Sequence, residues 1–387
     1  MRILVLSHAL INPIAQARWR KMANVGKNHI QLVVPKRWVV LWFGKKNINN
    51  ISDEQGDLFS IKTAKTTSDW NFSFYFFRGL RKVISDFKPD VIYPTHESNQ
   101  TIQMVLLHRF FFRRSKLLFF TMSQHVRTAP PLSFHPRHLI GFCWRRLAWW
   151  LLCNGTNGAI CHYPAIKDQL RKEGYKKPIL IQTQIGVDET IFKPDANERI
   201  NIRSKLGLNG FIVGFVGRVI SDKGIWDIAD AISQISYDVG LLIVGDGPDL
   251  DKLCDIATEG GWRERLHLQG EVPLIEVANI MQAMDCLFLG SRDTDGWVDT
   301  FPNVVAQAMS VGIPVIGSQS GAIPFLLGGR GLLYKQGDID EILSHINNLY
   351  IDESLGIKIG SSLRERALSE FCTESINDKF IDFLRLV

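Results

Sequence analysis

The sequence predicts an α/β protein of two domains, each built around a parallel β-sheet, and three observations support this prediction. Its 387 residues suit two or three domains at roughly 150 residues each. Short apolar segments alternate with longer segments of helical character, a pattern typical of parallel sheets covered on both faces. The two halves also differ in charge: residues 1–187 carry 28 Lys and Arg against 9 Asp and Glu, and residues 188–387 carry 17 against 30.

The predicted strands are short runs of apolar, β-branched or aromatic residues. In the first half they are residues 3–6, 31–34, 91–93, 117–121, 159–161 and 179–182, and in the second half 212–216, 241–244, 266–268, 286–289, 314–316 and 332–334. The alternation pauses between residues 186 and 210. We therefore expect domains at 1–187 and 188–369, with a C-terminal helix at about 370–387 that could pack back on the first domain.

The composition excludes several classes of protein. With 45% hydrophobic and 22% charged residues, the balance is that of a globular chain, which excludes a disordered or fibrous one. No apolar run reaches the roughly 18 residues needed to span a bilayer, since Arg145 and Arg146 interrupt the best candidate. The N-terminus is predicted as a buried strand rather than a secretion signal. Six cysteines without CxxC spacing favour a reduced, cytoplasmic protein without a metal cluster.

The first motif that carries chemistry is GFVGRVISDKG, residues 214–224. It predicts a strand, a glycine turn and then a helix, with Arg218 and Lys223 beside the turn. Glycine lets a backbone approach a ligand closely, and a helix start offers unpaired N–H groups to an anion. The motif therefore favours a diphosphate site, and the alternative is a loop with solvated charges. A second glycine turn, GDGP at 245–248, follows the next predicted strand.

The third motif is DTFPNVVAQAM, residues 299–309, followed by GIPVIGSQSGAIPFL at 312–326. It predicts a loop that enters a helix, with Pro302 in the first turn. Asp299 precedes the helix start, and Gln307 lies inside the helix. This arrangement again places free N–H groups at the carboxyl end of a strand. The alternative is a capped helix with polar residues on its outer face.

Together with DCLFLGSR at 285–292, the three motifs resemble glycosyltransferase family 4, strongly over residues 211–335 and thinly over the first 130. The resemblance implies two facing Rossmann-like domains with a cleft between them, which is the GT-B fold. It also implies a nucleotide sugar bound by the C-terminal domain, and transfer of the sugar with retention at its anomeric carbon. In that scheme cations and N–H dipoles stabilise the leaving diphosphate, and no metal is needed.

The resemblance also implies roles for particular residues. Arg218 and Lys223 match the family pair that binds the donor diphosphate. Asp299 and Gln307 occupy the places of two family glutamates that hold the donor sugar and the ribose, and Phe325 replaces a further one. The predicted catalytic residues are His125, Arg218, Lys223 and Asp299, and the predicted donor-binding residues are Gly217, Gly247, Val272, Thr300, Phe301, Pro302, Asn303 and Gln307.

The first half is predicted to bind the acceptor. His125 follows the predicted strand 117–121, and family members often carry a histidine there, near the donor sugar. The alternative is a loop histidine with a backbone partner. His8, His96 and Glu97 follow two other predicted strands and are further candidates for binding acceptor hydroxyls. The glycine pair that the family carries after its first strand is absent, so the resemblance implies no particular acceptor.

Basic and aromatic residues interleave at residues 36–46, 108–120 and 137–152, a composition that suits a membrane interface. We expect the basic half to contact anionic lipid, chiefly through 36–46, which has no helical or strand periodicity. The predicted contact residues there are Lys36, Arg37, Lys45 and Lys46 for the headgroups, and Trp38, Trp42 and Phe43 for the interface. The alternative for 137–152 is a core helix. Single-stranded nucleic acid also binds such residues but is not an expected partner.

The function predicted from these observations is that of a retaining, metal-independent glycosyltransferase. It would use a nucleotide sugar, with a UDP-sugar favoured over a GDP-sugar, and no other cofactor. The acceptor is expected to be lipid-linked or a glycan, in polysaccharide or glycolipid synthesis, with the protein peripherally attached to the cytoplasmic face of the membrane. Two alternatives stay open: a nucleotide-sugar epimerase of the same fold, and a catalytically inactive homologue that binds membrane or glycan.

Overall fold

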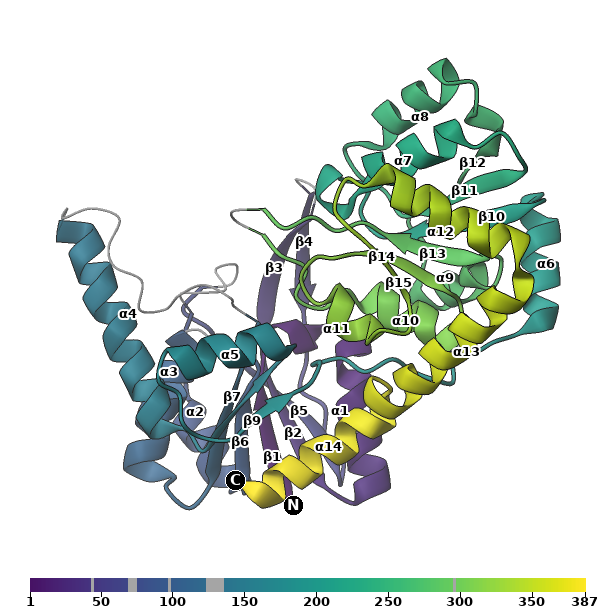
Figure 1. Ribbon diagram of the computed structural model, residues 1–387. Helices are drawn as coiled ribbons and strands as arrows, with labels where there is room; N and C mark the ends of the chain where they lie inside the picture. The colour runs from purple at the N-terminus through teal and green to yellow at the C-terminus, as the bar shows by residue number, and fades with distance from the viewer. Residues whose placement is uncertain (43–44, 69–74, 97–98, 123–135, 295–296) are drawn as a thin grey trace. The chain divides into compact units, whose positions relative to one another are not determined.

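In the computed structural model, the described residues are 1–42, 45–68, 75–96, 99–122, 136–294 and 297–387. The chain forms two compact units; in Figure 1 the first runs from purple to teal and includes the yellow C-terminal residues, and the second runs from teal to yellow. Unit 1 comprises Met1–Ile185 and Ile376–Val387, and unit 2 comprises Gly186–Ser375. The first division lies close to residue 187, where the sequence predicts the domain boundary, and residues 376–387 belong to unit 1.

In the described part of unit 1, seven parallel strands form one sheet in the order β5–β2–β1–β6–β7–β8–β9. Their bounds are β1 Arg2–Leu6, β2 His29–Pro35, β5 Phe59–Ala64, β6 Val91–Pro94, β7 Lys116–Thr121, β8 Gly158–Cys161 and β9 Ile179–Ile181. Ile3 on β1 pairs with Ile30 on β2 and with Val91 on β6. The central strands are buried on both faces, which is why they read as apolar runs in the sequence.

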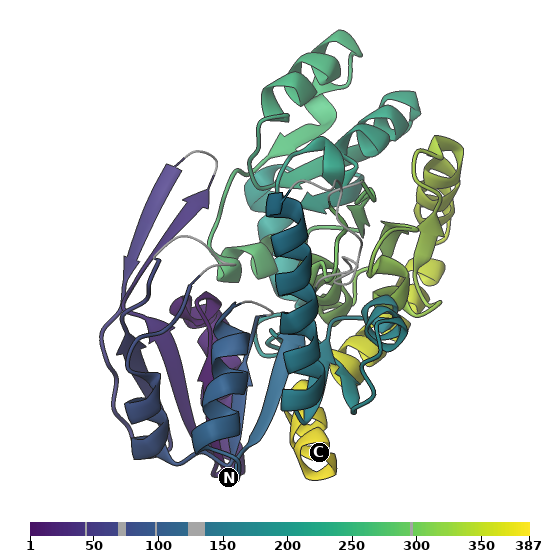
Figure 2. The same ribbon diagram turned by 90° about the vertical axis from the view of Figure 1, so that its left-hand side faces the viewer.

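Helices cover both faces of this sheet (Figures 1 and 2). On one face lie α1 Pro13–Gly26 and α14 Thr373–Leu386, where Trp19 and Phe380 pack edge to face. The other face carries α2 Leu80–Phe87, α3 Asn99–Phe111, α4 Pro136–Gly155 and α5 Pro164–Lys172. Their buried side chains, among them Ile84, Val105 and Leu152, form a second core against the sheet.

Two segments of unit 1 correct the sequence prediction. Two antiparallel strands, β3 Arg37–Trp42 and β4 Lys45–Asn50, pair with each other, where the sequence predicts no strand over 36–46. Trp38 does not enter a membrane interface, because only 1% of it is exposed and its ring stacks on His8. Strand β5 is also absent from the prediction. Its buried Phe59 and Ile61 alternate with the exposed or half-exposed Ser60 and Lys62, so it lacks the continuous apolar run of the central strands.

In the described part of unit 2, six parallel strands form one sheet in the order β12–β11–β10–β13–β14–β15. Their bounds are β10 Phe211–Val216, β11 Val239–Val244, β12 Leu266–Leu268, β13 Cys286–Leu289, β14 Val315–Ser318 and β15 Leu332–Tyr334. They closely match the six strands predicted for the second half. The parallel α/β architecture of both units confirms the predicted fold class.

The helices of unit 2 are α6 Ala196–Leu206, α7 Ile225–Gln234, α8 Leu250–Glu259, α9 Leu274–Met281, α10 Asn303–Val311, α11 Ile323–Leu327, α12 Ile339–Ile351 and α13 Glu353–Glu370. Side chains of alternate strand positions enter two cores, such as Ile212 on one face of β10 and Val213 on the other. Asp195, Asp338 and Asp352 cap the starts of α6, α12 and α13 by accepting backbone N–H groups. No described helix is both long and apolar enough to cross a membrane.

Candidate functional site

The loops that carry the predicted donor motifs follow β10, β11 and β13, at the carboxyl edge where parallel sheets commonly bind ligands. Glycines pack these loops backbone against backbone. A Cβ at Gly245 would overlap the carbonyl oxygen of Gly217, and a Cβ at Gly224 would overlap that of Gly290. Gly217 and Gly245 also have φ values of 141° and 136°, which side chains rarely allow. Glycine is therefore required here for the loops to touch.

Arg218 and Lys223 come from one strand-to-helix connection. Two backbone hydrogen bonds fix its first part: the Val219 N–H donates to the Asp246 carbonyl (3.0 Å), and the Asp249 N–H donates to the Val219 carbonyl (3.2 Å). The chain then passes through the 3₁₀ helix η2 Ser221–Lys223 into α7. Arg218 lies exposed in this connection, whereas the side chain of Lys223 is mostly buried.

Lys223 forms an ion pair with Asp299, which comes from the third motif. Ser291, directly after Gly290 and the end of β13, donates its hydroxyl to the same carboxylate oxygen at 2.9 Å. The ammonium group of Lys223 also lies 4.8 Å from the centre of the Trp297 ring. The structure thus brings together the cation predicted to bind the diphosphate and the carboxylate predicted to hold the donor sugar, although 76 residues separate them.

The remaining predicted donor residues lie around the start of α10. Pro302 is the N-cap residue of α10 and gives no side-chain cap, so backbone N–H groups of the first turn have no partner from that side chain. Asn303 is exposed, and Thr300 and Gln307 are half-buried. The Phe301 side chain is buried against Phe371, which leaves only its backbone for a ligand. Gly247 packs on Val219, and Val272 packs on the core of unit 2.

A buried carboxylate that the sequence reasoning missed supports this edge. Asp227, in the first turn of α7, forms an ion pair with Arg292 and accepts the hydroxyl hydrogen of Tyr334 at 3.2 Å. Burial, and then the charge of Asp227, raises the pKa of Tyr334. The Arg292 N–H also donates to the Asp222 carbonyl at 2.8 Å, so the loop after β13 is tied to η2. The sequence signal was an acidic residue within an otherwise apolar helix start.

In unit 1, the structure brings together two of the predicted acceptor residues. His8 follows β1, His96 follows β6, and their ring centres lie 5.4 Å apart. The Trp38 ring stacks on His8 at 5.0 Å, and the Tyr75 hydroxyl lies 3.3 Å from its Nδ1. Burial, with the nearby His96, lowers the pKa of His8 to about 3, so its ring is neutral at physiological pH. His125 and Glu97 lie outside the described residues.

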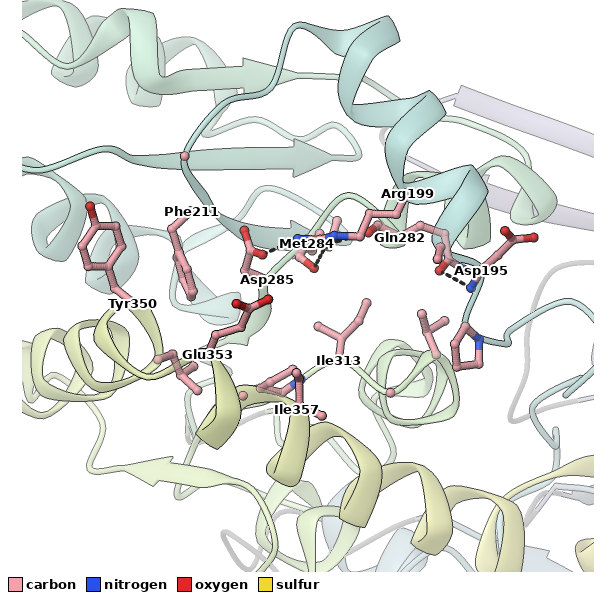
Figure 3. Close-up of a pocket in the computed structure, with 18 residues that line it drawn as sticks. Asp195, Arg199, Phe211, Gln282, Met284, Asp285, Ile313, Tyr350, Glu353 and Ile357 are labelled. Atoms are coloured by element: carbon pink, nitrogen blue, oxygen red, sulfur yellow. Dashed lines mark hydrogen bonds and ion pairs between the residues drawn. The ribbon is translucent and has the colours of Figure 1, made fainter.

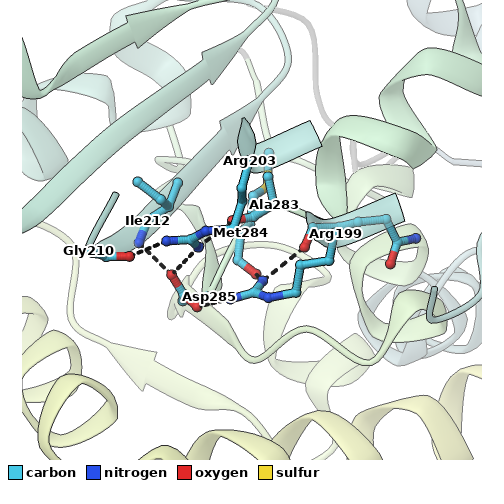
Figure 4. A network of polar contacts seen from close by, with 8 residues as sticks. Arg199, Arg203, Gly210, Ile212, Ala283, Met284 and Asp285 are labelled. Atoms are coloured by element: carbon cyan, nitrogen blue, oxygen red, sulfur yellow. Dashed lines mark hydrogen bonds and ion pairs between the residues drawn. The ribbon is translucent and has the colours of Figure 1, made fainter. Parts of the chain in front are cut away.

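A cavity of about 540 Å³ lies at the opposite, amino edge of the unit 2 sheet. Figure 3 shows Phe211, Ile313, Tyr350 and Ile357 on its apolar side and Arg199 on its polar side. Its half-buried acid, Asp285, is held by Arg199 and Arg203 and accepts the Ile212 N–H at 2.6 Å (Figure 4). These contacts tie α6 to the starts of two strands, so the charged groups here serve the structure. No described cluster of three His, Cys, Asp or Glu residues could hold a metal ion.

Comparisons with known proteins find similarity to glycosyltransferases, mainly in unit 2. Residues 210–352 match the family model described as "Glycosyl transferases group 1". The chain is 23% identical over 233 residues to the lipopolysaccharide core biosynthesis glycosyltransferase LpsE of Rhizobium meliloti, over 59% of this chain and 64% of that protein. It is 28% identical over 213 residues to a GDP-mannose-dependent alpha-(1-6)-phosphatidylinositol monomannoside mannosyltransferase of Mycobacterium tuberculosis, over 52% and 54%. The chain spans about half to two thirds of the length of these relatives.

Two solved structures share the fold along the whole chain. A sucrose-phosphate synthase of Thermosynechococcus elongatus has a TM-score of 0.71 at 17% identity, over 100% of this chain and 98% of that one. HepE of Anabaena, in a complex with UDP-glucose, has a TM-score of 0.69 at 19% identity, over 100% of both chains.

The fold that the chain shares with these solved structures is the two-domain GT-B fold. Within unit 2, residues 210–352 are similar to the group 1 glycosyl transferases, whose family model they match. The family resemblance drawn from the sequence motifs is confirmed at this level.

Proposed function

We propose that this protein transfers a sugar from a nucleotide-sugar donor to a lipid-linked or glycan acceptor, with retention at the anomeric carbon, in polysaccharide or glycolipid synthesis. The observation that carries the proposal is the ion pair of Lys223 and Asp299. It joins two distant motifs at the carboxyl edge of the unit 2 sheet, beside Arg218 and glycine-packed loops. A site of this kind suits a ligand that combines a diphosphate with a sugar.

The mechanism that follows is electrostatic. Negative charge develops on the diphosphate as its bond to the sugar breaks, and Arg218, Lys223 and the N–H groups at the start of α10 stabilise that charge. Without donor, Lys223 is neutralised by Asp299. A diphosphate that binds Lys223 competes with this carboxylate, which leaves Asp299 able to accept a hydroxyl hydrogen of the sugar. These steps use cations and dipoles of the chain itself, so we propose a metal-independent reaction without a further cofactor.

The donor that we propose is a UDP-sugar in preference to a GDP-sugar. HepE of Anabaena was solved with UDP-glucose, whereas the relative from Mycobacterium tuberculosis is described as GDP-mannose-dependent. A panel of UDP- and GDP-sugars scored by thermal shift tests the proposal, because a ligand that binds the folded state raises its unfolding temperature. A shift with GDP-sugars alone would contradict the choice of base.

Substitution of Lys223 tests the site itself. Lys223→Ala removes one charge-assisted contact, worth ~1.5–3 kcal/mol, and is expected to lower transfer about ten- to a hundredfold. Lys358→Ala, at an exposed position of α13, is the matched control and should behave as wild type. Transfer is also expected to survive EDTA. Wild-type turnover of the Lys223 variant, or loss of turnover in EDTA, would contradict the proposed mechanism.

Two other functions would give different results in the same assays. An epimerase would convert the nucleotide sugar without any acceptor, so acceptor-independent turnover would identify it. A catalytically inactive homologue would show neither transfer nor hydrolysis of any donor. The presence of Gln307 and Asp299 in place of the family glutamates is the observation that keeps the inactive homologue as the second candidate.

We also propose peripheral attachment to the cytoplasmic face of a membrane, which suits a lipid-linked acceptor. The excess of Lys and Arg in residues 1–187 supports it, because anionic leaflets attract cations near their surface. Of the predicted contact residues, Lys36 and Arg37 are exposed. Trp38 is buried and does not supply an aromatic contact, whereas Phe43 and the side chain of Trp42 lie outside the described residues.

A further inference from the structure

The exposed part of α4 is an unusual helix surface. Five consecutive residues, 143–147, are exposed, and at 3.6 residues per turn they cover the full circumference of the helix. Two of them are large and apolar: Trp144 is 43% exposed and Leu147 is 48% exposed. One turn later Trp150 is 59% exposed. Helices of globular proteins usually bury one apolar stripe, and large apolar side chains that are exposed close together commonly mark an interaction site.

The second half of the same helix is firmly anchored. Trp149 and Leu152 are buried in the core of unit 1, and the indole N–H of Trp149 donates to the Glu173 carbonyl at 2.9 Å. Gly155 lies against Val105 of α3. In Figure 1 the first half of α4 extends past the neighbouring helices of unit 1. The exposed residues are therefore presented on a rigid support.

The charged residues next to these apolar residues in the sequence are all positive. Arg145 and Arg146 are exposed on α4, and the guanidinium of Arg146 lies 5.5 Å from the centre of the Phe142 ring. No Asp or Glu occurs anywhere between Glu97 and Asp168, a stretch that holds nine Lys and Arg. An anionic partner would meet no repulsion from any side chain of this segment.

Helix α3, next to α4 on the same face of the sheet, repeats the combination. Phe110 and Phe111 are 70% and 50% exposed, and Arg109 is exposed beside them. Large rings with adjacent cations suit the interface of an anionic bilayer, where rings lie among headgroups. Nucleic acid would meet the cations equally well but gives no reason for exposing Leu147.

We propose that the α4 patch, defined as Trp144, Arg145, Arg146, Leu147 and Trp150, docks this protein on an anionic phospholipid bilayer. Trp144, Leu147 and Trp150 enter the interface, and Arg145 and Arg146 contact the headgroups. This inference rests on the proposed function insofar as a lipid-linked acceptor is found at such a surface. The α4 patch is a different surface from the contact predicted at residues 36–46, where Trp38 is buried.

Vesicle co-sedimentation of the full chain tests the proposal. Vesicles of mixed phosphatidylglycerol and phosphatidylcholine should bind wild type about tenfold or more tightly than pure phosphatidylcholine, and salt should weaken this binding. The triple variant Trp144→Ser, Leu147→Ser, Trp150→Ser and the double variant Arg145→Gln, Arg146→Gln should each lose about tenfold in affinity. The matched control is Ile351→Ser with Ile357→Ser, two exposed apolar residues of unit 2, which should bind as wild type.

Three outcomes would overturn the proposal: unchanged binding of the triple or double variant, equal binding to both kinds of vesicle, or binding to a single-stranded oligonucleotide without binding to vesicles. Circular dichroism and the thermal shift with nucleotide sugar, run on the same variants, report folding and the donor site separately. A protein that binds vesicles but no nucleotide sugar would refute the proposed function and leave the docking surface standing. A protein that binds nucleotide sugar but no vesicles would refute the docking surface and leave the proposed function standing.

Discussion

At the scale of single residues, Asp299 and Gln307 both stand where the resemblance expects a glutamate, but their surroundings differ. Asp299 is buried and satisfied by Lys223 and Ser291, so its charge is already used within the protein. Gln307 is half-buried on α10 and carries no charge. A neutral amide holds a hydroxyl less strongly than a carboxylate does. The weak point of the predicted donor site is therefore Gln307.

Substitution of Gln307 should change donor affinity in both directions. Gln307→Glu replaces a neutral hydrogen bond, worth about 0.5–1.5 kcal/mol, with a charge-assisted one of about 1.5–3 kcal/mol, and is expected to tighten donor binding severalfold. Gln307→Ala should weaken it. Isothermal titration with the best donor of the panel measures both changes. If neither variant differs from wild type, this position does not contact the ribose.

The buried His8 predicts how unit 1 responds to acid. Folded His8 takes up a proton only near pH 3, whereas its ordinary pKa is 6.5. Between these values the unfolded chain binds more protons, so the stability contributed by neutral His8 is complete above about pH 6.5 and is lost as the pH falls toward 3. Burial also lowers the pKa of His162 to about 3, so His162 likewise makes the folded state less stable as the pH falls.

His8→Phe keeps a ring beside Trp38 but cannot titrate. Over this pH range each buried histidine contributes a slope of up to about 1.4 kcal/mol per pH unit, so the variant should lose less stability than wild type between neutral and mildly acidic pH. Thermal unfolding of unit 1 at several pH values measures the difference. The exposed His29 provides the control His29→Gln, which should retain the wild-type dependence. Parallel pH profiles for wild type and His8→Phe would contradict the assignment.

At the scale of elements, Asp285 joins helix α6 to the amino edge of the unit 2 sheet. It receives Arg199 and Arg203 from α6 and the Ile212 N–H from β10. Its side chain is mostly buried, as is that of Arg203. Removal of one partner from such a pair leaves the others without their counter-charge.

Asp285→Asn should therefore destabilise unit 2 by about 2–4 kcal/mol, since two arginines keep their charge and lose their carboxylate. Urea unfolding of the full chain, followed by a probe of unit 2, measures the loss. Asp255→Asn, an exposed substitution on α8, makes the same chemical change and should cost little. Equal stability of the two variants would show that the Asp285 contacts contribute nothing.

At the scale of the whole molecule, the two ends of the chain meet in unit 1. Arg18 of α1 is buried and donates to Asn377 of α14 and to the Gln184 carbonyl, both at 3.0 Å. Burial lowers the pKa of Arg18 to about 10. Lys116 at the start of β7 donates to the Leu384 carbonyl at 2.7 Å. Both segments that lead out of unit 1 are thus tied to its own core.

Substitution of Phe380 tests whether α14 is part of the core of unit 1. It is fully buried and packs on Trp19 and Tyr93, so Phe380→Ala should cost unit 1 about 3–5 kcal/mol. Ile351→Ala, at an exposed position, is the control. Differential scanning calorimetry should show a lowered transition for unit 1 and an unchanged transition for unit 2. A small, uniform change in both transitions would mean that α14 is not an integral part of unit 1.

Much of unit 2 could be predicted because its signals are local. Its six strands are buried apolar runs, and its glycine turns stand directly after strands. Unit 1 was less predictable because some of its strands lack such a local signal. Strand β5 alternates buried and exposed residues, and the antiparallel pair of β3 and β4 gains its stability from a partner strand and from the burial of Trp38. Such stabilisation depends on contacts that sequence periodicity does not record.

The sequence by itself determined the fold class, the order of the donor motifs and the uneven charge of the two halves, because each of these follows from residue type and spacing. Only the tertiary structure decided which of those residues meet. It paired Lys223 with Asp299, joined Asp227 to Arg292 and Tyr334, and brought His8 beside His96. It also buried Trp38 while leaving Trp144 and Trp150 exposed. These outcomes depend on how distant segments pack, because residue type alone does not decide whether one particular tryptophan is buried or exposed.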